Sequence, residues 1–259
     1  MRKILLLLCI LLMACPVMAE GNSETAQQGD AKAINELDAK AVDAGQETEE
    51  AKGSIVIPRD EIFEKAREMV IAGEDARGFA LFELLADLGD AESQNNLGWL
   101  YETGKGVEKS LEKANQYYKM AADQGLVSSQ YNLALNYETG LGVEKDYAKA
   151  MEYYQMAAAQ GHAKSINNIG NLYEEGFGVE RDYARAMEYY QDSLAKGYDF
   201  ALTSIGYVYE NGLGVEPDLE KAVEYYRQAA EKGVENGVNH LNRLIREGKI
   251  VREYRIIGQ

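Results

Sequence analysis

The sequence has very few of the side chains that carry redox or metal chemistry. Its 259 residues include two cysteines and two histidines. Cys9 and Cys15 both lie near the N-terminus, ahead of the predicted folded part, and His162 and His240 stand far apart in the chain. A domain without cysteines holds no disulfide, and two isolated histidines do not make a metal ligand set. We therefore expect no disulfide, no metal and no cofactor, so that stability comes from packing alone.

Basic residues are also scarce relative to acidic ones. The chain has 27 Lys and Arg against 43 Asp and Glu, a formal net charge of −16. Most of this excess lies between residues 58 and 240. Such a surface repels nucleic-acid phosphates and anionic lipid headgroups. We expect no nucleic-acid partner, and membrane contact only through a lipid anchor.

What the sequence does contain is one pattern repeated at a step of 36 residues, first seen at Tyr101–Gly125. A Tyr-Glu pair leads into Gly-x-Gly-Val, then a Tyr-Tyr pair, and a closing Gly ends the unit. A period between 20 and 50 residues is typical of stacked supersecondary units. The recurring Tyr-Glu pairs are Tyr101-Glu102, Tyr137-Glu138, Tyr173-Glu174 and Tyr209-Glu210.

Each unit carries two helical patterns. In the second, Ala114, Tyr118 and Ala121 share one face, which predicts an amphipathic helix from about 110 to 124. Its expected N-cap residues are Ser110, Asp146, Asp182 and Asp218, and the closing Gly is its expected end. The first helix is expected near 90–102. Small residues stand where the two helices must approach closely, at Gly98, Ala134, Gly170 and Gly206.

These motifs resemble the Sel1-like repeat family, a relative of the tetratricopeptide repeat. The shared features are the Tyr-Glu-x-Gly-x-Gly-Val loop and the Lys-Ala…Tyr-Tyr…Ala-Ala…Gly helix. The resemblance implies an all-α, right-handed solenoid of helix-turn-helix units with a 36-residue period. The expected parts are a degenerate repeat at 58–89, full units at 90–125, 126–161, 162–197 and 198–233, and a capping helix with a basic tail at 234–259.

The first 19 residues read as a signal peptide. Arg2-Lys3 precedes the apolar run Ile4–Ala14, and Val17-Met18-Ala19 offers small residues at a cleavage site. A second interpretation is that Leu12–Cys15 is a lipoprotein box, with cleavage before Cys15 and lipidation of that residue. Both interpretations predict export from a bacterial cell, to the periplasm or beyond it.

Two further segments flank the repeats. Residues 20–57 are acidic and have almost no large apolar side chains before Ile55, which predicts a disordered linker. Residues 241–259 reverse the sign of the charge. Their apolar side chains would cap the open end of the stack, or the segment would dock on an acidic partner or an anionic membrane. The basic residues are Arg243, Arg246, Lys249, Arg252 and Arg255, and the apolar ones are Ile250, Val251, Tyr254, Ile256 and Ile257.

One motif raises the question of catalysis. Ser110-Leu111-Glu112-Lys113 reads S-x-x-K, the active-site motif of penicillin-recognising enzymes, and relatives of this repeat family have been described as β-lactamases. However, Ser110 occupies the N-cap slot that Asp fills in the other units, and the sequence has no Ser-Asp-Asn or Lys-Thr-Gly partner motif. We predict that the protein is not an enzyme, and keep activity through Ser110 as a remote alternative.

A protein-binding surface is the remaining candidate site. If the first helix of each unit lines the inner curve, the residues beside its core face are presented to a partner, and aromatic side chains are enriched at binding hot spots. Alternatively, some of them pack against neighbouring helices, and the recurring glutamates bond to the following loop. The predicted contact residues are Glu92, Asn95, Trp99, Tyr131, Asn132, Leu135, Asn167, Asn168, Asn171, Phe200, Thr203 and Tyr207.

The sequence therefore predicts a monomeric, exported scaffold. It would bind a protein or peptide ligand on the concave face of the solenoid, without catalysis. A secreted or surface factor that engages a host protein is the alternative function.

Overall fold

The computed structural model describes residues 57–251. This range contains eleven α-helices, and none of its residues forms a β-strand. None of these helices is long and apolar enough to cross a membrane. The chain divides between Leu88 and Gly89 into two compact units. The predicted signal peptide with Cys15, nearly all of the linker and the tail beyond Val251 lie outside the described residues.

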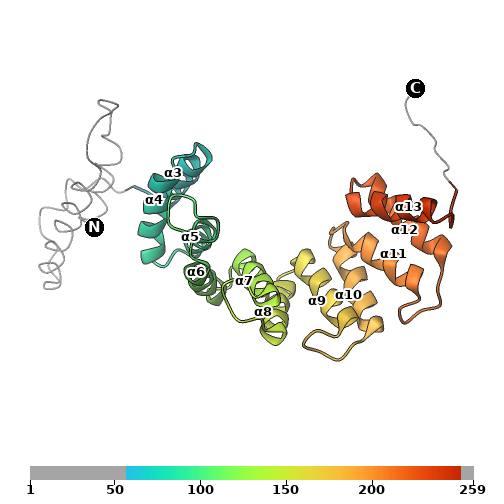
Figure 1. The fold of residues 1–259 in the computed structure, drawn as a ribbon. Coiled ribbons are helices and arrows are strands. Elements are labelled where there is room, and N and C mark those ends of the chain that lie inside the picture. Colours follow the sequence, from blue (N-terminus) through green and yellow to red (C-terminus); the bar gives the residue numbers. More distant parts are fainter. Residues whose placement is uncertain (1–56, 252–259) are drawn as a thin grey trace, which may run out of the picture. The chain divides into compact units, whose positions relative to one another are not determined.

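The first unit is a helix pair, α3 (Arg59–Ile71) and α4 (Asp75–Asp87), which pack side by side (Figure 1). Phe63 and Phe82 meet edge to face with ring centroids 5.5 Å apart. The turn between the helices contains a single glycine of positive φ, Gly73, in place of the Gly-x-Gly loop. The pair falls within the range predicted for the degenerate repeat.

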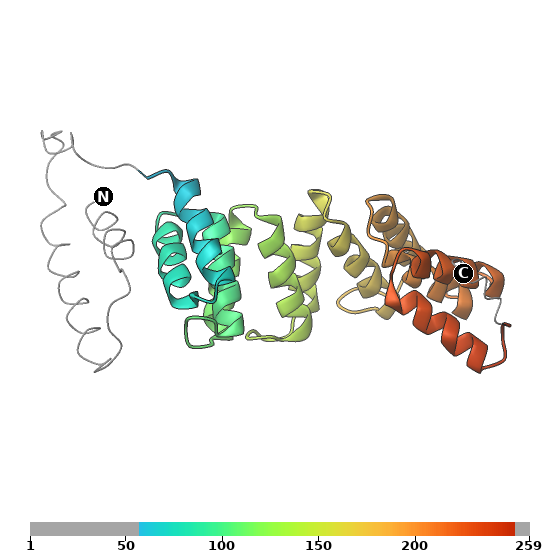
Figure 2. The same cartoon turned by 90° about the horizontal axis from the view of Figure 1, so that it is seen from above.

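The second unit, from α5 on, is a stack in which helices that follow one another in the chain pack side by side (Figures 1 and 2). We call the first helix of each repeat the A helix and the second the B helix. The A helices are α5 (Ala91–Thr103), α7 (Val127–Thr139), α9 (Ala163–Glu175) and α11 (Ala201–Asn211). The B helices are α6 (Leu111–Asp123), α8 (Tyr147–Ala159), α10 (Tyr183–Ala195) and α12 (Leu219–Glu231), and α13 (Glu235–Arg246) ends the stack. The predicted all-α solenoid is confirmed.

The helix ends follow the predicted capping residues. Ser110 accepts a hydrogen bond from the Lys113 backbone N–H at 3.3 Å, and Asp146, Asp182 and Asp218 do the same at 3.0, 3.0 and 2.9 Å. Each A helix ends at the first glycine of the Gly-x-Gly loop, in the left-handed conformation that glycine adopts without strain. Local sequence therefore sets where each B helix begins and where each A helix ends.

A buried tyrosine joins the two helices of each repeat. Tyr118, Tyr154, Tyr190 and Tyr226 are at most 1% exposed. Each hydroxyl donates a hydrogen bond to the glutamate near the end of its own A helix, at 2.5 to 2.9 Å. The expectation that these glutamates bond to the following loop is therefore wrong, because each carboxylate instead accepts a hydrogen bond from the B-helix tyrosine. The four glutamates are Glu102, Glu138, Glu174 and Glu210.

The small residues of the A helices lie directly against these tyrosine rings. A Cβ added to Gly170 would come within 2.6 Å of the Tyr190 ring, and Gly98 and Gly206 stand equally close to Tyr118 and Tyr226. In the second repeat Ala134 takes this position and packs in one cluster with Tyr154. The expected close approach of the two helices is confirmed at the glycine positions.

Within residues 57–251 no B helix follows α13, which is held to the stack by its side chains and by those of the residues just after it. Leu244 is buried, and Ile250 packs against the cluster of Ala222, Val223 and Tyr226. Val251 is 79% exposed, so the expected capping role is wrong for this residue, because the chain has already left the surface of α12. Tyr254, Ile256 and Ile257 lie outside the described residues.

An ion pair also fastens α13 to α11. Arg243 Nη2 lies 2.6 and 2.8 Å from the two carboxylate oxygens of Glu210, whose side chain is only 8% exposed. Burial by itself raises the pKa of Glu210, but hydrogen bonds from Arg243 and Tyr226 outweigh it, and the net pKa is lowered. Near this pair, burial and Arg243 lower the pKa of His240.

Replacing Gly170 by Leu should destabilise the middle of the stack. The added side chain collides with the fully buried Tyr190 ring, and overpacking of this kind costs roughly 1–3 kcal/mol. Urea unfolding measures the change, with Ala148→Leu, which adds similar volume at an exposed position of α8, as the control. An unchanged midpoint for Gly170→Leu would contradict the packing described here.

Replacing Arg243 by Ala should destabilise the second unit by about 1–3 kcal/mol at pH 7, because a largely buried carboxylate loses a charged donor. Since the pKa of Glu210 is lowered by folding, this contribution is present above the pKa of unfolded Glu, about 4.3, and disappears as the pH falls through the lower folded value. Urea unfolding at pH 7 and pH 3 checks both points, with Arg246→Ala as the control. A difference from wild type that is equally large at pH 3 would contradict the ion pair as its source.

Candidate partner-binding surface

Three of the four A helices expose a large apolar side chain at the same position. Trp99, Leu135 and Tyr207 are 37%, 36% and 40% exposed, and Asn171 takes the same position in the third repeat. We call these four residues the A ridge. Because they occupy equivalent turns of successive A helices, they lie on the same side of the stack. Exposed aromatic and aliphatic side chains in such a row are typical of a protein contact surface.

Neighbouring side chains also contact the predicted aromatic residues: the Lys105 ammonium lies 4.8 Å from the Trp99 ring centre, and the Tyr207 and His240 ring centroids are 6.4 Å apart. Tyr131 is half-buried, with the Lys164 ammonium 4.8 Å from its ring centre and the His162 ring at 5.1 Å. Phe200 is 49% exposed but lies one residue before α11, where it stacks on Tyr198. The alternative of packing against the next repeat thus holds for Tyr131, because its ring reaches the start of α9.

Most of the predicted asparagines bind other side chains of the stack. Asn95 Oδ1 accepts a hydrogen bond from Ser129 Oγ at 2.8 Å and a longer one from Asn132 Nδ2 at 3.4 Å. Asn168 Nδ2 donates to the Tyr154 hydroxyl at 2.9 Å, and Asn171 Oδ1 accepts from the Tyr190 hydroxyl at 2.9 Å. These carboxamides fix the A helices in place and present their remaining polar atoms beside the A ridge.

Two predicted contact residues are not at the surface. Asn167 is 6% exposed and its Oδ1 has no partner, while Thr203 is 8% exposed and donates to the Phe200 carbonyl at 2.7 Å. Both stand four residues before an A-ridge position, and in the first two repeats the residues at this position, Asn95 and Tyr131, are half-buried and contact the following repeat. Their prediction as presented contact residues is corrected, whereas Glu92 is exposed as expected.

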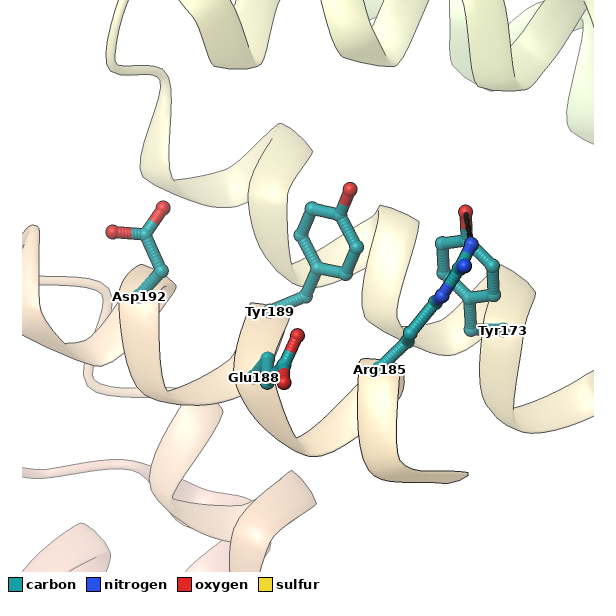
Figure 3. Close-up of a pocket in the computed structure, with 5 residues that line it drawn as sticks. All are labelled: Tyr173, Arg185, Glu188, Tyr189 and Asp192. Carbon is teal, nitrogen blue, oxygen red and sulfur yellow. Dashed lines mark hydrogen bonds between the residues drawn. The ribbon is translucent and has the colours of Figure 1, made fainter. Parts of the chain in front are cut away.

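A shallow depression on the B-helix side is lined by Tyr173, Arg185, Glu188, Tyr189 and Asp192 (Figure 3). The two tyrosine rings stack at 5.6 Å, and the Arg185 guanidinium lies 5.5 Å from the Tyr173 ring centre and donates to its hydroxyl at 3.3 Å. The same stack of two tyrosines beside one cation recurs in the other three repeats. It is therefore explained by packing between the A and B helices. The equivalent groups are Tyr101, Tyr117 and Lys113, then Tyr137, Tyr153 and Lys149, then Tyr209, Tyr225 and Lys221.

The S-x-x-K motif has a structural explanation in this fold. Ser110 Oγ caps α6, and the Lys113 ammonium lies 5.1 Å from the Tyr101 ring centre. His162 Nδ1 contacts Ser165 Oγ at 2.8 Å within its own helix start, and burial lowers the pKa of this histidine. Within residues 57–251 no group of three metal-ligating side chains comes together.

Arg243 was not among the predicted contact residues, but it stands in the same row as the A ridge. It stands 36 residues after Tyr207 and therefore occupies the A-ridge position of α13. The 36-residue step marks the position, but only the fold shows that a side chain there reaches the glutamate of the preceding A helix.

Comparison with known proteins identifies the repeat. The sequence matches the Sel1 repeat model at residues 91–126, 127–162, 163–198 and 200–234. A crystal structure of a Sel1 repeat protein from Oxalobacter formigenes is similar, with 36% identity over 68% of this chain and 70% of that chain and a TM-score of 0.62. No curated protein matches the sequence.

A second similar structure is c5321, described as a protective antigen present in uropathogenic Escherichia coli strains and displaying an SLR fold. It is 30% identical, with a TM-score of 0.64. The match covers 72% of this chain but 41% of that longer chain. With family matches over more than half of its length, this chain belongs to the Sel1 repeat family, whose members act as protein-interaction scaffolds and are generally not catalysts.

Proposed function

We propose that this protein is a non-catalytic scaffold that holds a protein or peptide partner along its A helices, on the concave face of the solenoid. The observation that carries this proposal is the exposure of Trp99, Leu135 and Tyr207 at the same position of three of the four repeats. Large apolar side chains in water are costly, and a partner that covers them recovers that cost. Aromatic anchors near the middle of an interface supply most of its energy.

The polar surroundings of the A ridge suit a peptide. The carboxamides of Asn132 and Asn168 are half-buried, and each spends an amide N–H on a neighbouring side chain. Their side-chain oxygens are left to accept hydrogen bonds from a partner's backbone. A rigid array of this kind loses little side-chain entropy on binding.

The variation of the A ridge also supports a binding role. The core positions keep the same residue type from repeat to repeat, as the four buried tyrosines do. The A ridge instead reads Trp, Leu, Asn, Tyr. Stacking therefore does not dictate these side chains, which leaves them available for recognition of a partner.

We further propose that the protein works outside the cytoplasm. The support is the basic start, the apolar run Ile4–Ala14 and the two cleavage sites of the first 19 residues. The acidic segment 20–57 would then connect the repeats to their anchor or to the mature N-terminus.

Trp99→Ala and Tyr207→Ala should each weaken partner binding by about 2 kcal/mol, roughly thirtyfold, without unfolding the stack. A pull-down from envelope extract and secreted material, quantified by mass spectrometry, compares wild type with the double variant. The control is Met120→Ala/Met156→Ala, which removes two exposed side chains from the B helices. Equal capture of every partner by wild type and by the A-ridge variant would refute the proposed surface.

Protein purified from its natural host should begin either at Glu20 or at a lipidated Cys15. Intact mass distinguishes the two, and palmitate incorporation that disappears in Cys15→Ala establishes the lipid anchor. A mature protein that retains Met1–Ala19 would disprove export by this route.

A further inference from the structure

The ion pair at the end of the stack shows how one A-helix carboxylate is neutralised. Glu210 accepts from the Tyr226 hydroxyl at 2.9 Å and is gripped by Arg243 at 2.6 and 2.8 Å. Arg243 reaches it from the A-ridge position of the following helix. The glutamate of the fourth repeat is thus paired with a guanidinium of the same chain, which comes from α13.

The other three repeats keep the glutamate but lack the guanidinium. Glu102, Glu138 and Glu174 each accept one hydrogen bond from a buried tyrosine. No ion pair within residues 57–251 joins any of them to a Lys, Arg or His side chain. At the position corresponding to Arg243 stand the uncharged side chains of Leu135, Asn171 and Tyr207.

These three glutamates are half-buried, and each has a second carboxylate oxygen that the tyrosine does not use. None of those oxygens is among the fully buried unpartnered atoms of the described residues, so solvent reaches them. Burial raises the pKa of Glu174, and the Tyr190 hydroxyl lowers it only in part. The pKa of Glu210 is instead lowered, because Arg243 is present. A half-buried carboxylate without a cation is unfavourable until a partner supplies one.

We propose that the partner supplies those cations: it is a basic segment whose arginine side chains pair with Glu102, Glu138 and Glu174 as Arg243 pairs with Glu210. This inference rests on the proposed function and names the chemistry of its ligand. Each glutamate of the first two repeats lies three residues after an A-ridge residue, Trp99 or Leu135, and therefore on the same side of its helix. An arginine that reaches the carboxylate would bring its neighbours in the segment against the apolar ridge.

The net charge of the protein favours the same partner. A chain of net charge −16 attracts basic segments and speeds their encounter. Arginine fits better than lysine because its planar guanidinium offers several donors to a carboxylate and stacks on aromatic faces such as Trp99. The row of glutamates then sets where along the stack the segment lies.

A purely structural role makes a different forecast. If the glutamates serve only to accept the tyrosine hydroxyls, glutamine can replace them, because its side-chain oxygen accepts the same bond. The triple variant Glu102→Gln/Glu138→Gln/Glu174→Gln should then fold and also bind like wild type. The control Glu152→Gln/Glu188→Gln/Glu224→Gln removes three exposed charges from equivalent positions of the B helices and leaves the same net charge.

The test uses fluorescent peptides of glycine and serine that carry three arginines and two leucines, with two to five residues between the arginines. Matched peptides contain citrulline, the neutral counterpart of arginine. Fluorescence anisotropy measures binding to the full mature protein. We expect at least one arginine spacing to bind, the A-helix glutamate variant to lose about tenfold or more in affinity, and the B-helix control to lose less than about twofold. The citrulline peptide should bind wild type weakly and be insensitive to the variants.

Three results would overturn the inference: equal losses in both triple variants, which indicate diffuse charge attraction; no loss in the A-helix variant; or no binding by any arginine peptide up to about 1 mM.

The proposed function is tested separately by Trp99→Ala/Tyr207→Ala in the pull-down. If that variant loses its captured partner while the glutamate variant keeps it, the binding surface stands and the arginine requirement fails. If the arginine peptide binds through the glutamates and no captured partner depends on the ridge, the proposed apolar surface is the part that fails.

Discussion

The contact between one tyrosine and one small residue is what the repeat depends on. In each B helix a fully buried tyrosine packs against a glycine or alanine of the A helix, close enough that an added Cβ at the glycines would overlap the ring. Its hydroxyl then reaches a glutamate further along the same A helix. The glycine sets the distance between the two helices, and the glutamate sets their rotation. No disulfide or metal is needed for this arrangement, because close packing and one charge-assisted bond fix both.

This fixed rotation also decides what the A helices present to solvent. With the tyrosine contact on one side, the residue three positions before the glutamate is exposed in the first, second and fourth repeats, whereas Asn171 of the third repeat is half-buried and accepts from the Tyr190 hydroxyl. Trp99, Leu135 and Tyr207 are exposed for this reason, whereas Asn167 and Thr203 are buried. The core can therefore stay constant while the surface residues vary. Such independence of scaffold and surface suits a family of interaction proteins.

The glutamate near the end of each A helix has different partners in the first three repeats and in the fourth. In the first three repeats it accepts a tyrosine hydroxyl and keeps an oxygen that solvent reaches. In the fourth, Arg243 covers it and ties α13 to α11. At α13 a charged bond to the preceding A helix adds to the packing of Leu244 and Ile250. Arg243 stands at the A-ridge position of α13, and its contact with Glu210 is the geometry that an external basic segment would copy.

The sequence by itself determined the repeat, its period, the helix ends and the small residues between helices. Each of these is a local or strictly periodic property: Ser110 and Asp146 cap the helix that follows them, and Gly170 recurs at the step that Gly98 and Gly206 define. The tertiary structure decided which polar groups pair across helices. The hydroxyl of Tyr118 donates to Glu102, which therefore does not bond to the loop. The hydroxyl of Ser129 donates to Asn95, and Arg243 pairs with Glu210. A periodic pattern gives the face on which a residue stands, but not the direction of a long side chain within that face. That direction is set by the neighbouring helix, which enters only when the stack is assembled.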